Sequence, residues 1–331
     1  MKKALNSVRN QGSAKRVLIT GIAGFAGSHL AEFLLSKKFE VFGFYLPSHS
    51  TANVDHIKDK INLIPCDLVN KKDVDAKVIK INPDYVFHLA AFASPAESFK
   101  NPKTTLENNI FAELNLLAAL VKIKSQAKIL VVGSADEYGN VDPKDLPIAE
   151  ETSLAPPSPY AVSKVAQDLL GLQFFLHHNL NIVRVRPFNH IGPRQSPHFV
   201  VSAFASQIAD LETKGGGTIR VGNLETWREF TDVRDMARAY FLALEKAKVG
   251  GVYNVGTGKP IKIAQILKIL LSFSRVKIKV VVDKKLYRPV DIVKIYCDSS
   301  KFRKETGWRP KINIEKTLSD TIDYERKKQN G

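Results

Sequence analysis

The sequence predicts an α/β protein built on a doubly wound parallel sheet, joined to a smaller and discontinuous C-terminal lobe. Two observations carry this prediction. In the first half, short β-branched runs alternate with longer helical patterns, which is typical of a parallel sheet with helices on both faces. Beyond Pro187 the alternation loosens, and Gly, Pro and charged residues interrupt shorter elements.

The individual elements follow from this alternation. Strands are expected at RVLIT (16–20), EVFGFY (40–45), LIPCDL (63–68), DYVFHLAA (84–91), KILVVGS (128–134) and NIVRVR (181–186). Helices are expected over 25–37, 71–81, 104–123 and about 160–178. The stretch 232–254 has the pattern of a helix, a turn and a strand, so we expect the chain to return to the first unit there. The predicted boundaries are a loose basic tail (1–15), a sheet domain (16–187 plus about 231–256) and a smaller lobe (about 188–230 plus 257–331).

Composition narrows the class of protein. A chain of 331 residues with 44% hydrophobic content is long enough to bury one large core or two joined cores. The formal charge is +16, and residues 251–331 hold 19 Lys and Arg against 8 Asp and Glu, which is +11. Such a field can attract nucleic acid, an anionic membrane or a diphosphate-bearing substrate. A solvated basic surface is the preferred interpretation, and nucleic acid is not expected because no zinc-finger, RNP or zipper motif accompanies the charge.

The cysteines and the first residues predict a cytoplasmic protein without a metal site. Only Cys66 and Cys297 occur, far apart and without the spacing of a disulfide framework or a zinc site. Residues 1–15 are polar and basic and lack the apolar stretch of a secretory signal. No apolar run approaches the length that spans a membrane, so no membrane partner is expected.

A glycine-rich segment directly follows the first strand. Gly21, Gly24 and Gly27 open the predicted helix through Leu30 and Leu35, with the spacing GxxGxxG. A glycine at the second position lets the backbone approach a phosphate, and the helix N-terminus supplies free N–H groups and a positive dipole end. In this strand–loop–helix context, the glycines predict the dinucleotide-binding turn of a Rossmann domain.

The residues at the end of the second strand bear on whether the cofactor is NAD or NADP. An acidic residue for the ribose hydroxyls of NAD is absent there, and Ser48 follows instead. A 2′-phosphate is not repelled, although no arginine stands ready to hold it. NADP(H) is therefore favoured, with NAD(H) as the alternative. Asp67, after the next strand, is placed to accept from the adenine amino group or to cap the following helix.

A serine, a tyrosine and a lysine form the candidate catalytic group. Tyr160 and Lys164 lie four residues apart and share one helix face, with Ser158 and Pro159 suited to begin that helix. An ammonium near a phenol lowers its pKa, which fits Tyr160 for proton transfer near neutral pH. Ser134, at the end of the fifth strand, can bond the reacting oxygen. Tyr324 and Lys328 have the same spacing but lie in a charged terminal helix, which we interpret as a solvated face.

These motifs resemble the extended short-chain dehydrogenases/reductases. The resemblance rests on the glycine loop, His88-Leu-Ala-Ala91, Ser134, and Tyr160 with Lys164, and it covers about residues 16–325. Within that family, the segments 186–193 and 221–235 are similar to GDP-mannose 4,6-dehydratases and the related GDP-4-keto-6-deoxymannose reductases.

The resemblance implies roles for individual residues. Asn189 and Arg228 are expected to contact the sugar-nucleotide diphosphate, Asn223 and Leu224 the base or ribose, and Arg288 a second phosphate. Ser94 and Asn109 are further candidates, for sugar contact and helix support, whereas His88 is expected to be a packed strand residue. The expected cofactor contacts are Gly21, Gly24, Phe25, Ala26, Gly27, Ser48, Asp67, Leu68, Leu89, Ala90, Ala91, Tyr160, Lys164 and Pro187. The resemblance also implies a homodimer formed through helices 104–123 and 160–178.

The loop after the fifth strand distinguishes dehydration from reduction. Dehydratases of this family carry Thr, then Asp or Ser, then Glu where this chain has Ser134, Ala135 and Asp136. Ala135 has no proton to give, and Asp136 is one methylene shorter than glutamate, although it remains a catalytic candidate. Glu137 would point to the other side if the strand continued. We therefore expect reduction of the C4 ketone of GDP-4-keto-6-deoxymannose, with GDP-mannose 4,6-dehydratase, a 4-epimerase or a non-catalytic NAD(P)-binding sensor as alternatives.

Overall fold

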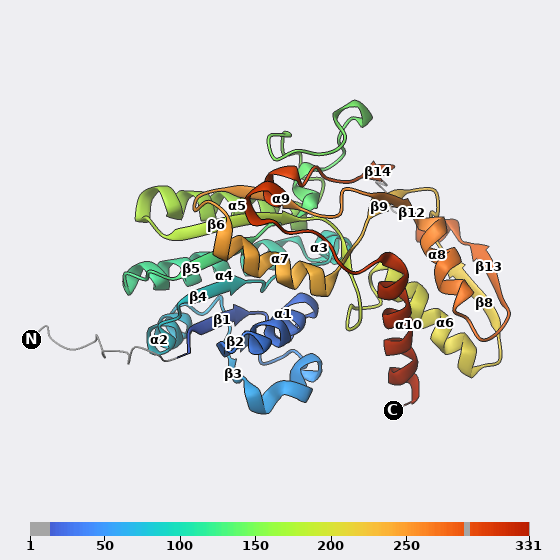
Figure 1. The fold of residues 1–331 in the computed structure, drawn as a ribbon, viewed down its shortest axis with the longest axis horizontal. Coiled ribbons are helices and arrows are strands. Elements are labelled where there is room, and N and C mark those ends of the chain that lie inside the picture. Colours follow the sequence, from blue (N-terminus) through green and yellow to red (C-terminus); the bar gives the residue numbers. More distant parts are fainter. Residues whose placement is uncertain (1–13, 288–291, 331) are drawn as a thin grey trace, which may run out of the picture.

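The computed structural model describes residues 14–287 and 292–330. Its centre is a seven-stranded sheet in the order β11, β6, β5, β4, β1, β2, β3 (Figure 1). The strands are β1 (Arg16–Thr20), β2 (Glu40–Tyr45), β3 (Asn62–Pro65), β4 (Tyr85–His88), β5 (Lys128–Val132), β6 (Asn181–Pro187) and β11 (Val252–Val255). All neighbours in this sheet pair in parallel, which confirms the predicted doubly wound α/β fold.

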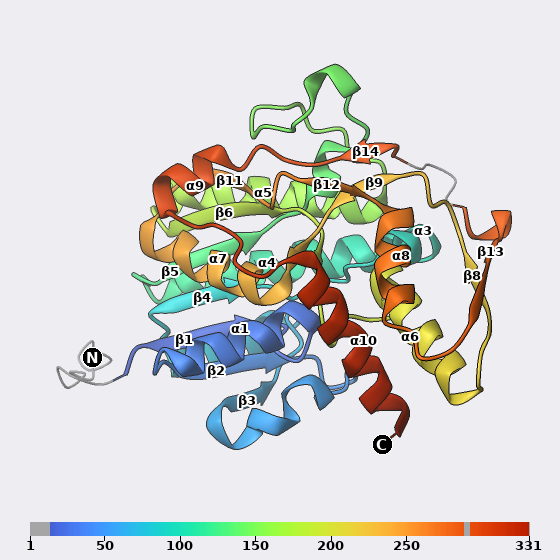
Figure 2. The same ribbon diagram turned by 45° about the vertical axis from the view of Figure 1, so that its right-hand side comes forward.

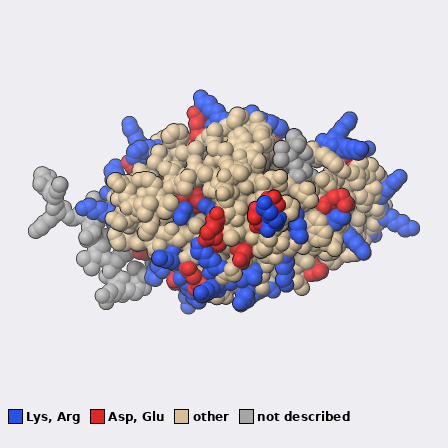
Figure 3. All heavy atoms as spheres, turned by 90° about the horizontal axis from the view of Figure 1, so that it is seen from above, with Lys and Arg blue, Asp and Glu red and all other residues tan. Residues whose placement is uncertain are grey.

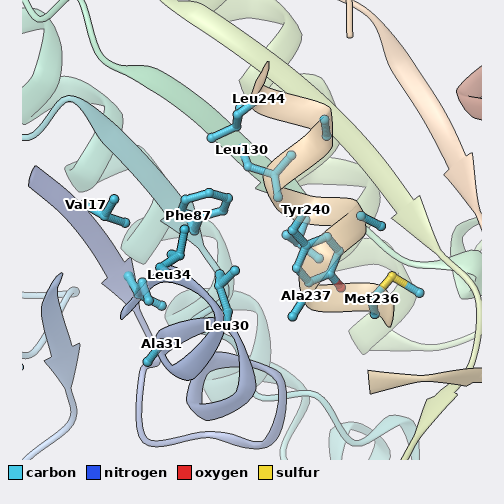
Figure 4. Packing of buried hydrophobic residues seen from close by; sticks show 14 of the residues in the cluster. Val17, Leu30, Ala31, Leu34, Phe87, Leu130, Met236, Ala237, Tyr240 and Leu244 are labelled. Carbon is cyan, nitrogen blue, oxygen red and sulfur yellow. The ribbon is translucent and has the colours of Figure 1, made fainter. Parts of the chain in front are cut away.

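Helices cover both faces of the sheet. One face carries α1 (Phe25–Ser36) and α7 (Val233–Lys246), and the other carries α2 (Lys71–Ile81), α4 (Pro102–Lys122) and α5 (Pro159–His178). Under the first pair, Leu30 and Leu34 of α1 and Tyr240 of α7 pack with Val17 and Phe87 of the strands, all essentially without solvent contact (Figure 4). This buried stripe is why the apolar residues of α1 recur at helical spacing.

The strand order reverses between β1 and β4. From β1 the chain proceeds to β2 and β3 on one side, whereas β4, β5 and β6 lie on the other. In open sheets of this kind, ligands bind at the carboxyl ends of the strands where the order reverses. The loops that follow β1 and β4 are therefore the first place to look for a site.

The chain after Pro187 builds a second core and adds one more strand to the sheet. The second core is formed by α6 (Val200–Thr213), α8 (Ile263–Ser272) and α10 (Ile314–Asn330) with the parallel pair β8 (Gly217–Val221) and β13 (Ile278–Val282). These elements stand beside the sheet in Figure 2. The added strand is β11, which pairs with β6, as the pattern of 232–254 predicts.

The remaining described elements are short, and they lie within or between the two parts. They are α3 (Pro95–Lys100), α9 (Ser300–Thr306), β7 (His190–Ile191), β9 (Trp227–Glu229), β10 (Thr231–Asp232), β12 (Pro260–Lys262), β14 (Lys294–Ile295) and the 3-10 helices η1 (Ala52–Lys60), η2 (Ala135–Tyr138), η3 (Pro143–Asp145) and η4 (Lys284–Leu286). Phe302 of α9 and Trp308 are fully buried in the core that α1 and α7 form with the sheet, although the predicted boundaries assign them to the smaller lobe. The indole of Trp308 donates to the Asp235 carbonyl at 3.0 Å, which fixes this segment against α7.

One face of the molecule shows how its charged side chains are distributed. On the face shown in Figure 3, Lys and Arg lie mostly around the margin, and Asp and Glu are interspersed with them. Within the described ranges, no helix has the length and apolar character needed to cross a bilayer.

Candidate active site

The glycine loop is tightly packed on one side and open on the other. Gly21 has φ +71°, and a Cβ there would lie 2.9 Å from Ala90 Cα, so only glycine lets the loop touch the end of β4. A Cβ on Gly27 would lie 2.3 Å from the Gly21 carbonyl oxygen. Gly24 precedes α1 without a side-chain cap, and a Cβ there meets only the Gly21 oxygen, at 3.1 Å. The N-terminus of α1 at Phe25 is thus accessible to a ligand.

Thr20 joins this loop to the end of β4. Its Oγ1 accepts from the N–H groups of Leu89 and Ala90, each at 3.2 Å, and lies 2.8 Å from His88 Nδ1. Burial lowers the pKa of His88 to about 3, so the ring is neutral. His88 is a packed strand residue, as predicted.

Ser134, Tyr160 and Lys164 meet at the carboxyl end of β5. The side chain of Ser158 accepts from Ala161 N at 3.1 Å and so begins α5, with Pro159 at its first position, as predicted. Tyr160 is hydrogen-bonded to Ser134. Lys164 donates from Nζ to the Val132 carbonyl at 2.8 Å. Tyr160 and Lys164 are only 8% and 5% exposed, so both side chains are shielded from bulk water.

The expected acidification of Tyr160 by Lys164 is wrong for this structure. Burial and the negative charge of Asp136 raise the pKa of the Tyr160 phenol, and the bond to Ser134 only partly opposes them. Burial also lowers the pKa of Lys164 from its usual 10.5 to about 8. Spacing along a helix indicates which groups are neighbours, whereas desolvation decides the direction of each shift.

The two acids after Ser134 have different surroundings because the chain turns into η2. Asp136 is half-buried, and its charge acts on the Tyr160 phenol. Glu137 is fully buried and accepts from Ser134 N at 2.7 Å. The strand does not continue here as the prediction for Glu137 assumed, because the chain turns into a 3-10 helix in which Glu137 bonds the backbone of Ser134.

The remaining cofactor candidates line the edge of the sheet. Ser48 and Asp67 are exposed just beyond β2 and β3, Leu68 and Pro187 are buried, and Ala26 and Ala91 are partly covered. Asp67 accepts from Val69 N at 3.0 Å within a turn, whereas Asn70 caps α2. The alternative role of Asp67 as a helix cap is therefore wrong.

The predicted substrate residues lie on loops of both parts. Ser94 caps α3, and Asn189 is exposed just past β6. Asn223 Oδ1 accepts from Glu225 N at 2.9 Å, and Arg228 Nη1 donates to the carbonyls of Trp227 and Ile292. Arg288 lies outside the described residues. Contact of these side chains with a diphosphate stays a prediction.

Two features of the site were not assigned a role from sequence. Glu113 of α4 is fully buried, its Oε2 lies 3.9 Å from His88 Nε2, and burial raises its pKa well above the usual value. An acid on the apolar stripe of residues 104–123 is the signal that could have found it. Asn109, one turn earlier, bonds Phe92 and Ser163 and thereby has the predicted supporting role. The second feature is the pairing of Glu137 with Arg186, which local sequence does not reveal.

Two further sequence expectations concern peripheral residues. Tyr324 is half-buried and lines a cavity with His29, Arg194 and Arg234, so its helix face is not simply solvated. Within residues 14–287 and 292–330, no group of three His, Cys, Asp or Glu side chains is arranged to hold a metal ion.

Proteins with this strand order, glycine loop and tyrosine–lysine pair form the short-chain dehydrogenases/reductases, and the second lobe marks the extended branch of that class. The chain belongs to the family described as GDP-mannose 4,6 dehydratase, whose model matches residues 18–321.

Its relatives include a reductase and a dehydratase, the two activities that the sequence analysis compared. The chain is 32% identical to the GDP-6-deoxy-D-mannose reductase of Pseudomonas aeruginosa over 305 residues, which cover 92% of this chain and 95% of the relative. It is 26% identical to the GDP-mannose 4,6-dehydratase of Yersinia enterocolitica, with 96% of each chain covered.

Solved structures extend the likeness. RMD from Pseudomonas aeruginosa, in complex with NADPH, has a TM-score of 0.83 at 30% identity, with 95% of this chain and 100% of that chain covered. A UDP-glucose 4-epimerase from Thermotoga maritima, with UDP-glucose, has a TM-score of 0.86 at 29% identity over 95% of this chain and 99% of that one.

Proposed function

We propose that this protein is an NAD(P)-dependent nucleotide-sugar oxidoreductase that reduces the C4 ketone of GDP-4-keto-6-deoxymannose. The observation that carries the proposal is the hydrogen-bonded pair of Ser134 and Tyr160. The pair lies at the carboxyl end of the sheet, one helical turn from Lys164 and on the same edge as the glycine loop. Two neighbouring hydroxyl groups that can donate hydrogen bonds suit a carbonyl oxygen that gains negative charge as it is reduced.

The described residues fit a dinucleotide cofactor. The uncapped start of α1 offers backbone N–H groups at Phe25 and Ala26, and the space over Gly24 is open for a pyrophosphate. When bound, the reduced nicotinamide supplies the hydride that reaches C4. Lys164 would hold the cofactor ribose, while Leu89, Ala90 and Ala91 would line its other side.

NADP(H) is the proposed preference. Ser48 is exposed at the end of β2, where a carboxylate would repel a 2′-phosphate. The relative whose structure contains NADPH is consistent with this choice, although another solved relative, an epimerase from Thermus thermophilus, contains NAD.

The side chains of the site would move one proton. Ser134 donates to the ketone oxygen and holds it against Tyr160, whose phenol gives its proton to that oxygen as the alcohol forms. The raised pKa of Tyr160 keeps the phenol protonated before each turnover, as a proton donor requires.

The substrate is proposed to span both lobes. Asn189 and Arg228, with Arg288 beyond the described residues, would contact the diphosphate, and Asn223 with Leu224 would face the base or ribose. Ser94 would contact the sugar. A cluster of donors from both parts would place C4 over the Ser134 and Tyr160 hydroxyls.

A second candidate function is GDP-mannose 4,6-dehydration. It is favoured by Asp136, because the charge of this carboxylate acts on the Tyr160 phenol and a carboxylate near that phenol would be the group to move a second proton. Ala135 argues against this function, because it is buried and its methyl side chain can act as neither an acid nor a base. A 4-epimerase is a further alternative, because solved epimerases share the fold over nearly the whole chain.

We also propose a homodimer in the cytoplasm. On α5, Leu169 and Leu176 are 50% and 67% exposed, and Phe111 on the neighbouring α4 is 47% exposed. Apolar side chains of this size on two packed helices suit contact with a second copy. Cys66 and Cys297 are free thiols, which suits a reducing compartment.

Parallel assays separate the candidates. With the keto sugar and NADPH, the proposal predicts cofactor oxidation and formation of a 4-hydroxy product. With GDP-mannose and NADP⁺, it predicts no loss of water by mass spectrometry. Water loss without NADPH oxidation would show that the dehydratase assignment is the right one.

A further inference from the structure

Glu137 forms a closed hydrogen-bonded ring with Ser134. Its Oε1 accepts from Ser134 N at 2.7 Å, while Ser134 Oγ accepts from Asp136 N at 3.1 Å. The two bonds form a reciprocal capping box at the start of η2. They leave Ser134 in one extended conformation, with φ −158° and ψ 149°.

The other end of Glu137 is tied into the sheet. Its Oε2 lies 3.2 Å from Arg186 Nε on β6, and Arg186 Nη2 donates to Asp168 of α5 at 2.5 Å. Arg186 Nη1 also donates to the Tyr138 hydroxyl at 2.9 Å. Glu137 and Asp168 are almost completely buried, so the network is not exchanged for water. The backbone of Ser134 is thereby connected through Glu137 to the strand beside it.

The carboxylate of Glu137 fills the space next to the backbone of Gly133. A Cβ on Gly133 would lie 2.2 Å from Glu137 Oε1, so the carboxylate occupies the room that a side chain there would need. The same Cβ would lie 3.2 Å from the Val185 carbonyl oxygen. The absence of a side chain at Gly133 is therefore what allows Glu137 to reach Ser134.

We propose that Glu137 is a positioning residue of the active site, which fixes the Ser134 backbone so that its hydroxyl meets Tyr160 at the substrate carbonyl. The inference rests on the proposed function of Ser134 and Tyr160. Glu137 does not touch substrate; it acts on turnover through Ser134 alone. A displacement of about 1 Å in a reacting group can cost about 100-fold in rate, which sets the size of the expected effect.

Two substitutions at Glu137 separate its hydrogen bond from its charge. Glu137→Leu removes the acceptor, and we expect kcat to fall about 100-fold while KM and the Kd for NADPH change less than about threefold. Glu137→Gln keeps an acceptor for Ser134 N, and we expect kcat within about threefold of the wild type. Amide hydrogen exchange at Ser134 supplies a readout independent of activity. The amide stays protected in the wild type and Glu137→Gln and exchanges faster in Glu137→Leu.

A further variant keeps the test decisive if Glu137→Leu does not fold. Gly133→Ala displaces the carboxylate without removing it, and it is expected to lower kcat and the protection of the Ser134 amide together. Asp235→Asn is the matched control, because Asp235 is also a buried carboxylate that accepts two backbone N–H groups, from Lys311 and Ile312. It is expected to lower the melting temperature and leave kcat unchanged.

The outcomes distinguish this inference from the proposed function. If Tyr160→Phe and Ser134→Ala lose turnover while folded Glu137→Leu or Gly133→Ala retains it, the positioning role is wrong and the proposed function stands. Equal losses in Glu137→Gln and Glu137→Leu would also contradict the hydrogen-bond explanation. Full turnover in Tyr160→Phe would overturn the proposed function itself.

Discussion

Gly24→Ala is predicted to weaken cofactor binding without harming the fold. The backbone at Gly24, with φ −73° and ψ 177°, is one that alanine adopts freely. The added methyl would meet only the Gly21 oxygen, at 3.1 Å, so the free energy of unfolding should change by less than about 1 kcal/mol. The methyl instead occupies the space where the pyrophosphate would approach α1.

The size of the binding loss follows from the hydrogen bonds at risk. A hydrogen bond from a backbone N–H to a charged phosphate contributes about 1.5–3 kcal/mol. Losing one such bond weakens binding by about 10- to 150-fold, because 1.4 kcal/mol corresponds to a factor of about ten. We therefore expect the Kd for NADPH to rise by that factor, as measured by fluorescence titration, while urea unfolding stays near the wild type.

Gly27→Ala is the comparison variant. Its methyl would lie 2.3 Å from the Gly21 oxygen and 2.9 Å from Ile22 Cα, both backbone atoms. Overpacking of this kind costs about 1–3 kcal/mol, so this variant should lose stability as well as affinity. Wild-type NADPH affinity in Gly24→Ala would refute the assignment of this loop to the cofactor.

Three further predictions concern the surroundings of the site. In Lys164→Met, activity should be lost. The pKa of Lys164 is 10.5 in the unfolded chain and about 8 in the folded protein, so between these pH values the folded state binds fewer protons than the unfolded state. The stability of the wild type relative to the variant should therefore increase as the pH rises from about 8 to about 10.5. Urea unfolding at about pH 7 and about pH 10 checks the sign, and a pH-independent difference would contradict it. Asn109→Ala removes bonds to Phe92 and Ser163 and should cost about 2–4 kcal/mol of unfolding free energy, whereas an unchanged denaturation midpoint would rule out the supporting role. The double variant Leu169→Asp and Leu176→Asp should be monomeric by light scattering if the exposed face of α5 is the dimer contact, and an intact dimer would place the contact elsewhere.

The parts of the molecule with local signals were predictable from sequence. The glycine loop, the Ser158 cap of α5 and the pair Tyr160 and Lys164 depend on residues within a few positions of one another, so spacing and residue type were sufficient. The strand after residue 84 ends at His88, shorter than the apolar pattern suggests. Because β4 ends at His88, residues Leu89 to Ala91 form a loop at the carboxyl end of the sheet.

The parts that depend on distant contacts were not predictable. Glu137 and Arg186 lie 49 positions apart and meet only because β5 and β6 are neighbours. The burial of Tyr160 follows from packing against other elements, and it reverses the pKa shift that helical spacing suggests. Trp308 joins the sheet core through its bond to Asp235, which no pattern in the terminal segment indicates.

The most direct measurement of the central claim is turnover of Tyr160→Phe with the keto sugar and NADPH. The variant keeps the aromatic ring and removes the phenol hydroxyl, and with it the proton and the hydrogen bond to Ser134. Because a positioned proton donor contributes about 100- to 10,000-fold, kcat should fall by that factor while the Kd for NADPH is retained. Undiminished NADPH oxidation by this variant would contradict the assignment of Tyr160 as the proton donor.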